Sequence, residues 1–285
     1  MQNRRRHGEM VACLPALAIF LMLFLLTRRP EPAHPTFRKN FQMAYNESAG
    51  FFNDMRQNDW QKLKERIRTT PDCDGNGCKS SGAPEWYQRN WEPAFTCQHE
   101  RRIGQMGDGG KWVCDPHRIH KKSCLVYSVG SENDFSFEEA VWTMVSPECE
   151  IHTFDPTIGE QPSNLPAGNI HFHPWGLAAQ DDGVFKTLPT IITELGHTGR
   201  EIDIFKIDCE GCELNTYRGW FEGATNIRQI QIELHGGTEG RPPVQAQKLM
   251  LFLKSNGYVI FHKEPNIQHG GGSCVEYSFL RLNLV

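Results

Sequence analysis

A chain of 285 residues has room for one large α/β domain and a smaller N-terminal portion. Its formal net charge of -4 argues against a general nucleic-acid binder, which normally carries a basic face. A hydrophobic content of 39% and a charged content of 22% are ordinary for a folded domain. The sequence shows neither a repeat nor a long low-complexity tract.

The first distinctive feature is an uncharged apolar run over residues 10–26 with arginines on both sides. Its length is at the lower limit for a helix that crosses a bilayer. The residues after it, Leu-Leu-Thr-Arg-Arg-Pro, lack the small side chains of a signal-peptide cleavage site. The sequence therefore predicts a single-pass signal-anchor, with a cytoplasmic tail at 1–9, a transmembrane helix at 10–26 and a stem at 27–70. So short a span suits the thin membranes of the early secretory pathway, the endoplasmic reticulum or Golgi.

Cysteine usage points to the luminal side of that membrane. Five cysteines fall in one loop-rich stretch: Cys73, Cys78, Cys97, Cys114 and Cys124. In an oxidising lumen such a stretch is cross-linked by disulfides, so we expect the C-terminal domain to be luminal. A zinc site is the alternative, because His99, His117 and His120 lie among these cysteines. It is less favoured because no tight Cys-x-x-Cys pair recurs there.

The segments between the anchor and the main domain carry few signals. Three prolines within residues 28–40 predict an extended linker. Asn46-Glu47-Ser48 is a glycosylation acceptor sequence. Apolar residues spaced over 51–68 predict an amphipathic helix. Residues 71–122 show no sustained periodicity, and we expect an irregular, disulfide-linked collar that packs against the domain that follows.

From residue 123 to 285 the sequence alternates short apolar strands with helical segments, the pattern of a doubly wound, Rossmann-like α/β sheet. The predicted strands are 124–129, 150–154, 169–173, 202–207, 227–234, 258–262 and 274–282. The predicted helices are 135–145, 187–195 and 244–256. We expect the last two strands to form a hairpin-like pair.

The central candidate site lies in Ile202–Glu213, with the sequence IDIFKIDCEGCE. A buried strand ends there in a group of acids that includes Asp208 and Glu210. Ligands of open α/β sheets bind beyond the carboxyl ends of the strands, so these acids are placed to touch a ligand. The next strand ends in Glu233 and His235, the same kind of chemistry. A solvated loop with acids in the first turn of a helix is the alternative interpretation.

The first two predicted strands carry features of a nucleotide-cofactor site. Gly130 follows the first strand, where a residue without a side chain lets a ligand approach the backbone. Asp155 lies about 25 residues later, the spacing of an acid that accepts hydrogen bonds from ribose hydroxyls. A turn-forming Asp-Pro pair is the alternative for Asp155. The absence of G-x-G-x-x-G disfavours a nicotinamide-dependent oxidoreductase.

The region from about residue 123 to 282 contains the sequences CLVYSVG, HTFDP, FKIDCEGCE, IQIELH, HKEPN and CVEYSFL. It resembles the FkbM-type branch of S-adenosylmethionine-dependent methyltransferases, and within it the membrane-anchored animal methyltransferase-like proteins. The resemblance implies a seven-stranded sheet with an antiparallel last hairpin and S-adenosylmethionine as cofactor. The sequence departs from the family pattern at Ser128 and Asp134, where members often have an acid and a second glycine. Asp134 is then expected to contact the methionine amine of the cofactor, beside Gly130 and Asp155.

These features together predict methyl transfer to a hydroxyl or carboxylate oxygen of an acceptor in the secretory lumen. The predicted catalytic residues are Asp208, Glu210, Glu233 and His235, with His235 as the general base. A divalent cation held by the three acids is a less favoured addition. The alternative function is a non-catalytic, membrane-tethered binding protein that keeps the fold. We expect membrane contact through the N-terminal helix and no nucleic-acid partner.

Overall fold

The computed structural model describes residues 35–71, 83–119, 124–223, 225–235, 244–266 and 274–284. The chain divides into two compact units, Met1–Asn40 and Phe41–Val285, and the second unit contains the central sheet. The predicted transmembrane segment at 10–26 lies outside the described residues. Within the described ranges, no helix has the length and apolar character needed to cross a membrane.

Two helices begin the described part of the chain, α2, Pro35–Glu47, and α3, Gln57–Thr69. The extended linker predicted for 28–40 is therefore wrong from residue 35 onward. Proline is well tolerated in the first turn of a helix, because its missing N–H would have no intrahelical partner there. The helix predicted over 51–68 is confirmed from residue 57, whereas residues 51–54 form a turn.

The collar contains short regular elements that its composition did not reveal. They are helix α4, Ala83–Arg89, the antiparallel strands β1, Arg101–Ile103, and β2, Lys111–Val113, and the 3-10 helix η1, Pro116–Arg118. Ile103 and Val113 are completely buried in a core that they share with strands of the main sheet. The predicted packing of the collar against the domain is therefore confirmed.

The central sheet contains seven strands in the order β10-β11-β9-β8-β3-β4-β5. Five are parallel: β3, Leu125–Val129; β4, Glu150–Phe154; β5, Ile170–His173; β8, Glu201–Ile207; and β9, Asn226–Leu234. The last two, β10, Tyr258–Asn266, and β11, Cys274–Arg281, pair antiparallel, and β11 lies between β10 and β9. The predicted doubly wound sheet with an antiparallel last hairpin is confirmed.

Helices connect these strands close to the predicted positions. They are α5, Ser136–Ala140, which continues as the π-helical η2, Val141–Val145; α6, Leu188–Glu194; α7, Cys212–Thr216, which continues as the 3-10 helix η3, Tyr217–Gly219; and α8, Val244–Ser255. A small parallel pair, β6, Gly176–Leu177, and β7, Phe185–Lys186, lies between β5 and α6 in the chain.

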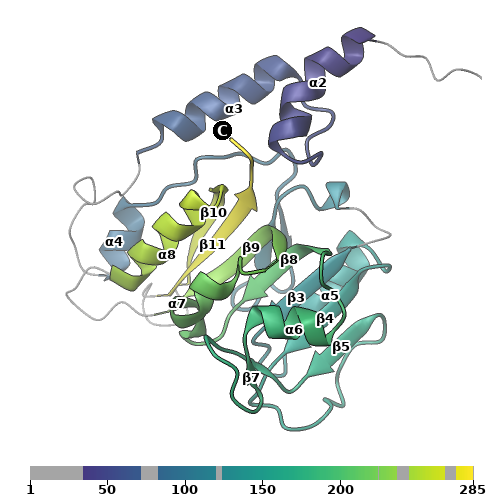
Figure 1. Cartoon of the computed structure of the whole chain (residues 1–285). Coiled ribbons are helices and arrows are strands. Elements are labelled where there is room, and N and C mark those ends of the chain that lie inside the picture. Colours follow the sequence, from purple (N-terminus) through teal and green to yellow (C-terminus); the bar gives the residue numbers. More distant parts are fainter. Residues whose placement is uncertain are drawn as a thin grey trace, which may run out of the picture. The chain divides into compact units, whose positions relative to one another are not determined.

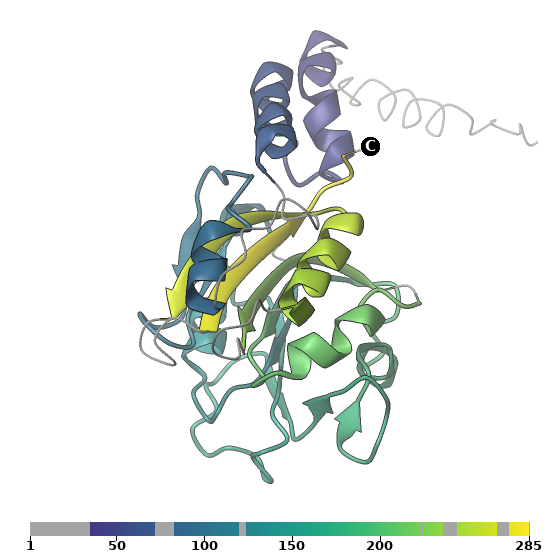
Figure 2. The ribbon, with the colours of Figure 1, turned by 90° about the vertical axis from the view of Figure 1, so that its left-hand side faces the viewer.

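Successive side chains of each strand point to opposite faces of the sheet, so the hydrophobic core has two parts, one on each face. On one face, Tyr127 and Phe205 pack with residues of α4, α6, α7 and α8. On the other face, Val126 and Ile204 pack with the collar, with α5 and η2 and with Trp60 of α3. Figures 1 and 2 show α8 alongside the strands of the antiparallel end of the sheet. Both faces are covered, which explains why the parallel strands read as continuous apolar runs.

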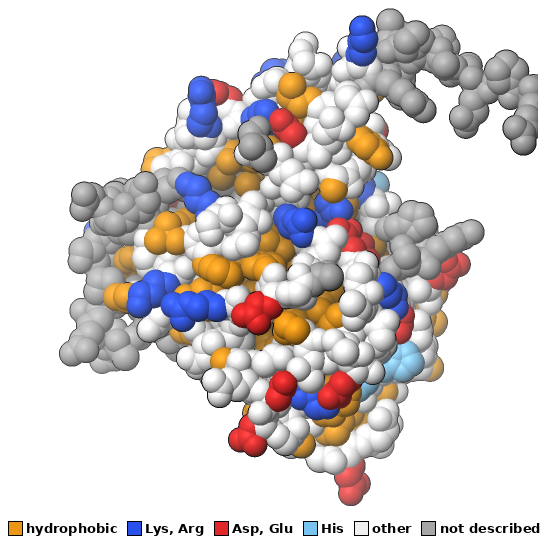
Figure 3. Space-filling model, in the orientation of Figure 1, with side chains coloured by type: hydrophobic (Ala, Val, Ile, Leu, Met, Phe, Trp, Pro, Cys, Tyr) orange, Lys and Arg blue, Asp and Glu red, His pale blue; other side chains and the backbone are white. Residues whose placement is uncertain are grey.

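The surface carries charges of both signs. On the face drawn in Figure 3, lysine and arginine side chains are interspersed with aspartate and glutamate side chains. A mixed distribution of this kind produces only a weak field over that face.

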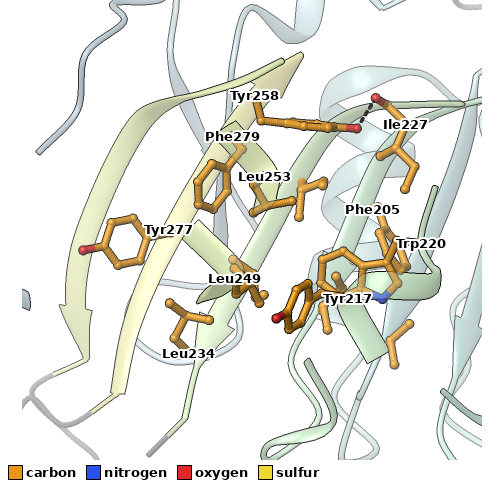
Figure 4. Packing of buried hydrophobic residues seen from close by; sticks show 14 of the residues in the cluster. Phe205, Tyr217, Trp220, Ile227, Leu234, Leu249, Leu253, Tyr258, Tyr277 and Phe279 are labelled. Carbon is orange, nitrogen blue, oxygen red and sulfur yellow. Dashed lines mark hydrogen bonds between the residues drawn. The ribbon is translucent and has the colours of Figure 1, made fainter. Parts of the chain in front are cut away.

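The packing of α8 on the sheet is shown in Figure 4. Leu249 and Leu253 of α8 lie among residues of β9 and β11, including Leu234 and Phe279, and all four are buried. The hydroxyl of Tyr258 donates a hydrogen bond of 2.7 Å to the carbonyl of Ile227, which satisfies a polar group within this apolar layer.

The opposite face of β9 and β11 is polar, and strand β2 of the collar supplies its partners. Gln229 of β9 exchanges two hydrogen bonds with the backbone of Cys114, of 2.8 and 2.9 Å. Ser278 of β11 donates to the carbonyl of Trp112 at 2.9 Å. Buried polar groups are tolerated only with partners, so this half of the sheet depends on the collar. The same contact brings Lys111 to the carboxyl ends of the strands.

Candidate active site

The sheet reverses its strand order between β3 and β8, and Gly130 and Asp208 follow these two strands. Gly130 has a positive φ of 81°, and a Cβ atom there would lie 1.6 Å from the carbonyl oxygen of Asp208. Only glycine fits so close an approach. Gly130 and Asp208 therefore lie side by side at the topological switch point, where open α/β sheets bind their ligands.

Lys206 of β8 fixes the turn at Gly130. Its side chain is buried, and its ammonium donates a hydrogen bond of 2.5 Å to the carbonyl of Gly130. The ammonium also lies 5.9 Å from the ring centre of Phe137 in α5. Lys206 therefore connects β8 to the loop that follows β3.

Asp155, which follows β4, is buried rather than an exposed turn residue. One carboxylate oxygen accepts from the N–H and hydroxyl of Ser131 and from the N–H of Glu132, at 2.8 to 3.1 Å. The other oxygen accepts from the N–H and hydroxyl of Thr157, at 2.9 and 2.6 Å. Although burial opposes ionisation, these hydrogen bonds lower the pKa of Asp155. The carboxylate thus holds the loop after Gly130 in place.

Asp134 is exposed at the beginning of α5. One carboxylate oxygen accepts a hydrogen bond of 2.9 Å from the N–H of Ser136, and the other accepts one of 2.6 Å from the side-chain amide of Gln105. Asp134 lies on the same loop as Gly130, and its predicted contact to the cofactor stays a prediction. Its carboxylate also joins this loop to the collar.

A group of acids gathers around Lys111, whose side chain is 1% exposed. Its ammonium lies 2.8 Å from a carboxylate oxygen of Asp208, 3.9 Å from one of Glu233, and within hydrogen-bonding distance of Glu276. Burial alone would raise the pKa of Asp208, but the charges of Lys111 and Lys206 hold it well below its ordinary value. Asp208 is therefore ionised at neutral pH and paired with Lys111.

Glu233 behaves differently from Asp208. Burial, together with the negative charges of Asp208 and Glu276, raises the pKa of Glu233 to about 8. Its carboxylate oxygen accepts a hydrogen bond of 3.0 Å from the side-chain amide of Asn266 in β10. Two neighbouring acids with opposite pKa shifts form an arrangement that enzymes use for proton transfer.

His235 lies between these acids and Glu213. One oxygen of the completely buried Glu213 accepts from the His235 N–H at 2.9 Å and lies 3.2 Å from ring atom Nδ1. Ring atom Nε2 lies 3.5 Å from Glu210, 3.7 Å from Asp208 and 3.9 Å from Glu233. Burial alone would lower the pKa of His235, but the hydrogen bond to Glu213 and the neighbouring negative charges raise it to about 9. The ring is thus protonated at neutral pH.

The sequence matches the family described as "Methyltransferase domain" over residues 42–281. The chain belongs to this methyltransferase-domain family. The match includes the collar as well as the sheet. The chain also resembles a solved structure described as a fibrillarin pre-rRNA processing protein of Methanococcus jannaschii, with 10% identity and a TM-score of 0.37. That likeness covers 65% of this chain and 83% of the other. A comparison with curated proteins finds no match.

The methyltransferase domain brings together all four residues that we predicted to be catalytic. Glu210 is the most exposed of them, at 87%, and its φ is positive, at 56°. Gly130, Asp134 and Asp155 lie on neighbouring loops at the same carboxyl edge of the sheet. This grouping follows from strand direction, because parallel strands end at one edge.

Several residues of the site were not predicted: Lys111, Glu213 as the partner of His235, Asn266 and Glu276. Lys111 and Glu276 are 165 positions apart in the sequence, so local patterns do not connect them. A usable signal existed for Lys111, since a lysine beside the apolar pair Trp112 and Val113 is an unusual strand residue.

Among the described residues, two disulfides stabilise the methyltransferase domain and a third lies in its candidate site. Cys97–Cys114 closes the collar, and Cys124–Cys149 joins the residues that precede β3 and β4. Cys97 and Cys114 are thereby occupied, which opposes the zinc alternative at those two residues. Cys209–Cys212 bridges a separation of 3 residues within the motif that carries Asp208 and Glu213.

The acids of the site are neutralised by cations of the chain itself. Ligand atoms of Asp208, Glu210 and His235 lie within 4.8 Å of one another, a spacing that a divalent cation could occupy. Asp208 already pairs with Lys111, however, and His235 is an imidazolium. A protonated histidine cannot ligate a metal. The group therefore fits a proton-handling site better than a magnesium site.

Proposed function

We propose that this methyltransferase domain transfers the methyl group of S-adenosylmethionine to a hydroxyl or carboxylate oxygen, as a member of the FkbM-type branch and its membrane-anchored animal relatives. The family supports methyl transfer in general. The switch-point turn at Gly130 and the loop held by Asp155 offer the place for the cofactor. The group around His235 offers the place for the acceptor.

The observation that carries the proposal is the position of His235 beside the ionised Asp208, which follows β8, and the buried Glu213 of α7. The donor supplies a positively charged sulfonium whose methyl group is attacked in line by the acceptor oxygen. Asp208 and Glu210 place negative charge next to that region, which stabilises a cation there. Methyl transfer then depends mainly on alignment, since the reactive methyl group comes with the cofactor.

His235 becomes the base only when a second positive charge lies nearby. A like charge disfavours the protonated form of a group, so a bound cation at the acids lowers the pKa of His235 from about 9. The ring can then accept the proton of a hydroxyl acceptor through Nε2, while Glu213 holds Nδ1. A carboxylate acceptor is already ionised and needs no base, and His235 then orients it.

We further propose that the domain is luminal in the endoplasmic reticulum or Golgi and is attached by a single N-terminal helix. The buried disulfides Cys97–Cys114 and Cys124–Cys149 support an oxidising compartment. Asn46 of the glycosylation sequence is exposed in the last turn of α2. The acceptor is then a luminal molecule, and on the face drawn in Figure 3 the basic side chains are interspersed with acidic ones rather than gathered in a patch for nucleic acid.

A non-catalytic binding protein is the second candidate, and one observation favours it. Lys111 pairs with Asp208 and Glu276, and Asp155 already has five hydrogen bonds from the chain. Acids that are fully engaged in this way serve the fold without any ligand. The two candidates differ in whether His235 exchanges a proton during binding.

The test is calorimetric titration of the full chain with S-adenosylmethionine at pH 8, in buffers of different ionisation enthalpy. We expect one site per chain and release of a proton that is absent in His235→Gln. A Glu194→Gln variant is the control, because that acid lies on α6, is 43% exposed and pairs with Lys186. Cofactor binding without proton release contradicts the role of His235, and no binding supports the second candidate.

A further inference from the structure

A second group of polar side chains lies at the opposite, amino-terminal edge of the sheet. Glu150 is the first residue of β4, His152 follows on the same face, and His197 lies in the turn between α6 and β8. Oxygen Oε1 of Glu150 lies 3.1 Å from Nε2 of His152 and 3.1 Å from Nε2 of His197. The two histidine side chains are 6% and 5% exposed. The proposed methyl transfer uses none of these three residues.

The remaining polar atoms of these three side chains contact residues that do not belong to the group. The hydroxyl of Tyr127 lies 2.7 Å from Nδ1 of His197. Nε2 of His173 lies 2.8 Å from Nδ1 of His152. The guanidinium of Arg200 donates to the second oxygen of Glu150 at 2.6 Å.

The three side chains thus bring their ligand atoms together, and one ligand atom from each lies within 4.8 Å of the other two. Metal-binding histidines characteristically have their second ring nitrogen engaged in this way, and the engaged atom fixes the orientation of the ring.

We propose that Glu150, His152 and His197 bind one Zn²⁺ ion. In tetrahedral zinc sites the metal lies about 2.0–2.1 Å from nitrogen and oxygen ligands, which places the ligand atoms about 3.3 Å from one another. The two measured separations of 3.1 Å are within a few tenths of an ångström of this value. Two imidazoles and one carboxylate suit zinc, and the fourth position is left for water.

The alternative is a network of hydrogen bonds without a metal. In that case both Nε2 atoms carry hydrogens and donate to Glu150, and both Nδ1 atoms accept from Tyr127 and His173. The metal-bound form reverses these roles, because each Nδ1 must carry the hydrogen and donate. Both forms keep the contacts of the two Nδ1 atoms with Tyr127 and His173, and the grouping of three ligand atoms favours the metal.

The position of the group assigns the ion a structural role. The cofactor edge of the sheet lies at the carboxyl ends of the strands, whereas Glu150 begins β4. A metal here would join the α6–β8 turn to β4, and β4 and β8 flank β3 in the sheet. An ion that binds only the folded chain raises its stability by mass action. The site is thus independent of whether the domain transfers methyl groups.

The test uses the full chain, stripped of metal with a chelator and titrated with ZnCl₂. We expect one equivalent of zinc to bind through this group, a rise of the melting temperature, and the visible spectrum of four-coordinate Co²⁺ when cobalt replaces zinc. His152→Gln, His197→Gln and Glu150→Gln should each weaken zinc binding by about 100-fold. Tyr127→Phe removes only the partner of His197 and should weaken it by about 10-fold, the lower end of the range for such partners.

His117→Gln is the matched control, because it removes a histidine of the collar and leaves this group intact. It should bind zinc as the parent chain does. Zinc binding that persists at the parental affinity in the four variants places the ion elsewhere and overturns the proposal. So does a chain that binds no stoichiometric zinc. If a ligand variant fails to fold, Tyr127→Phe and the zinc-dependent melting of the parent chain still decide the question.

Discussion

The ammonium of Lys111 lies 2.8 Å from a carboxylate oxygen of Asp208, although the two residues are 97 positions apart in the sequence. Lys111 belongs to strand β2 of the collar, and Asp208 follows strand β8 at the switch point of the sheet. The family match begins at residue 42 and so includes the collar that carries Lys111. The collar supplies the positive charge that keeps the buried carboxyl group of Asp208 ionised.

We predict that Lys111→Met lowers the free energy of unfolding by about 3–5 kcal/mol, because it leaves buried carboxylates of Asp208 and Glu276 without their partner. Urea unfolding measures this change. Lys64→Met is the control, since the Lys64–Glu47 pair has side chains that are 29% and 17% exposed. Its expected effect is below about 1 kcal/mol. Equal effects of the two substitutions would show that the buried ion pairs of Lys111 contribute no more to stability than the partly exposed pair of Lys64.

We predict that Asp155→Ala destabilises the domain as well as weakening cofactor binding. The substitution leaves the N–H groups of Ser131, Glu132 and Thr157 without an acceptor. A hydrogen bond to a charged group contributes about 1.5–3 kcal/mol, so even the loss of two of these bonds should cost about 3–6 kcal/mol.

Asp181→Ala is the matched control for Asp155→Ala. Asp181 also accepts hydrogen bonds from a backbone N–H and a hydroxyl, of Thr187 and Thr190, but it is exposed. Thermal unfolding should show a much smaller shift for Asp181→Ala. If the Asp155→Ala chain melts like the parent but no longer binds S-adenosylmethionine, Asp155 serves only as a ligand of the ribose and does not stabilise the fold.

The raised pKa of His235, about 9, predicts how stability depends on pH. A group that binds its proton more tightly in the folded state stabilises that state fully below its unfolded pKa, about 6.5 for histidine. The contribution is lost as pH rises through about 9. Glu233 acts in the same direction, because its folded pKa is raised from 4.5 to about 8.

The melting temperature should therefore fall between about pH 6.5 and pH 9, and His235→Gln should reduce the part of this slope that lies above pH 8. Differential scanning calorimetry of both chains over this range measures the effect. His117→Gln provides the comparison, because it lies in the collar away from the acids. A slope that His235→Gln leaves unchanged would mean that His235 is not protonated in the folded chain.

Loss of the Cys209–Cys212 disulfide and loss of the Cys124–Cys149 disulfide should affect different properties, cofactor binding in the first case and stability in the second. Chain entropy predicts about 2 kcal/mol for a bridge that spans 3 residues and about 3.5 kcal/mol for one that spans 25. The short bridge lies between Asp208 and Glu213, so its loss should mainly disturb cofactor binding. We expect paired Cys→Ser variants to show this contrast in urea unfolding and in titration with S-adenosylmethionine. Equal losses of binding would contradict it.

Much of the fold could be predicted because its signals are local. Glu150–Phe154 was predicted at its observed bounds, since Asp155 and Pro156, which are typical turn residues, follow it directly. The helix that begins at Pro35 was missed because its prolines were interpreted as a linker. The β1–β2 pair was missed because strands of three residues are too short for an alternating pattern.

The location of the candidate site could be predicted from the sequence, but the pKa values and the burial of its residues could not. Asp208 and His235 follow strands, and strand direction alone brings them to one edge. The opposite pKa shifts of Asp208 and Glu233 depend on Lys111, which comes from a separate part of the chain. The burial of Asp155 depends on the loop after β3, which an isolated Asp-Pro sequence does not reveal.

Glu210 provides the cleanest test of function, because its side chain is 87% exposed and its nearest charged partner is His235 at 3.5 Å. We predict that Glu210→Gln leaves the melting temperature unchanged, since an exposed ion pair contributes little to stability. If Glu210 helps to hold a cationic cofactor or the acceptor, binding or turnover should nevertheless fall, by about 10-fold or more.

Asp208→Asn is the companion to Glu210→Gln, and the two separate function from fold. Asn can still accept a hydrogen bond from Lys111, but it removes the charge that balances that lysine. We therefore expect a lower melting temperature together with a loss of turnover of about 10²-fold, the range for a positioned acid or base. A Glu210→Gln chain with parental binding and turnover, beside an Asp208→Asn chain that simply unfolds, would show that these acids serve the fold. That result would favour the non-catalytic binding protein over the methyltransferase.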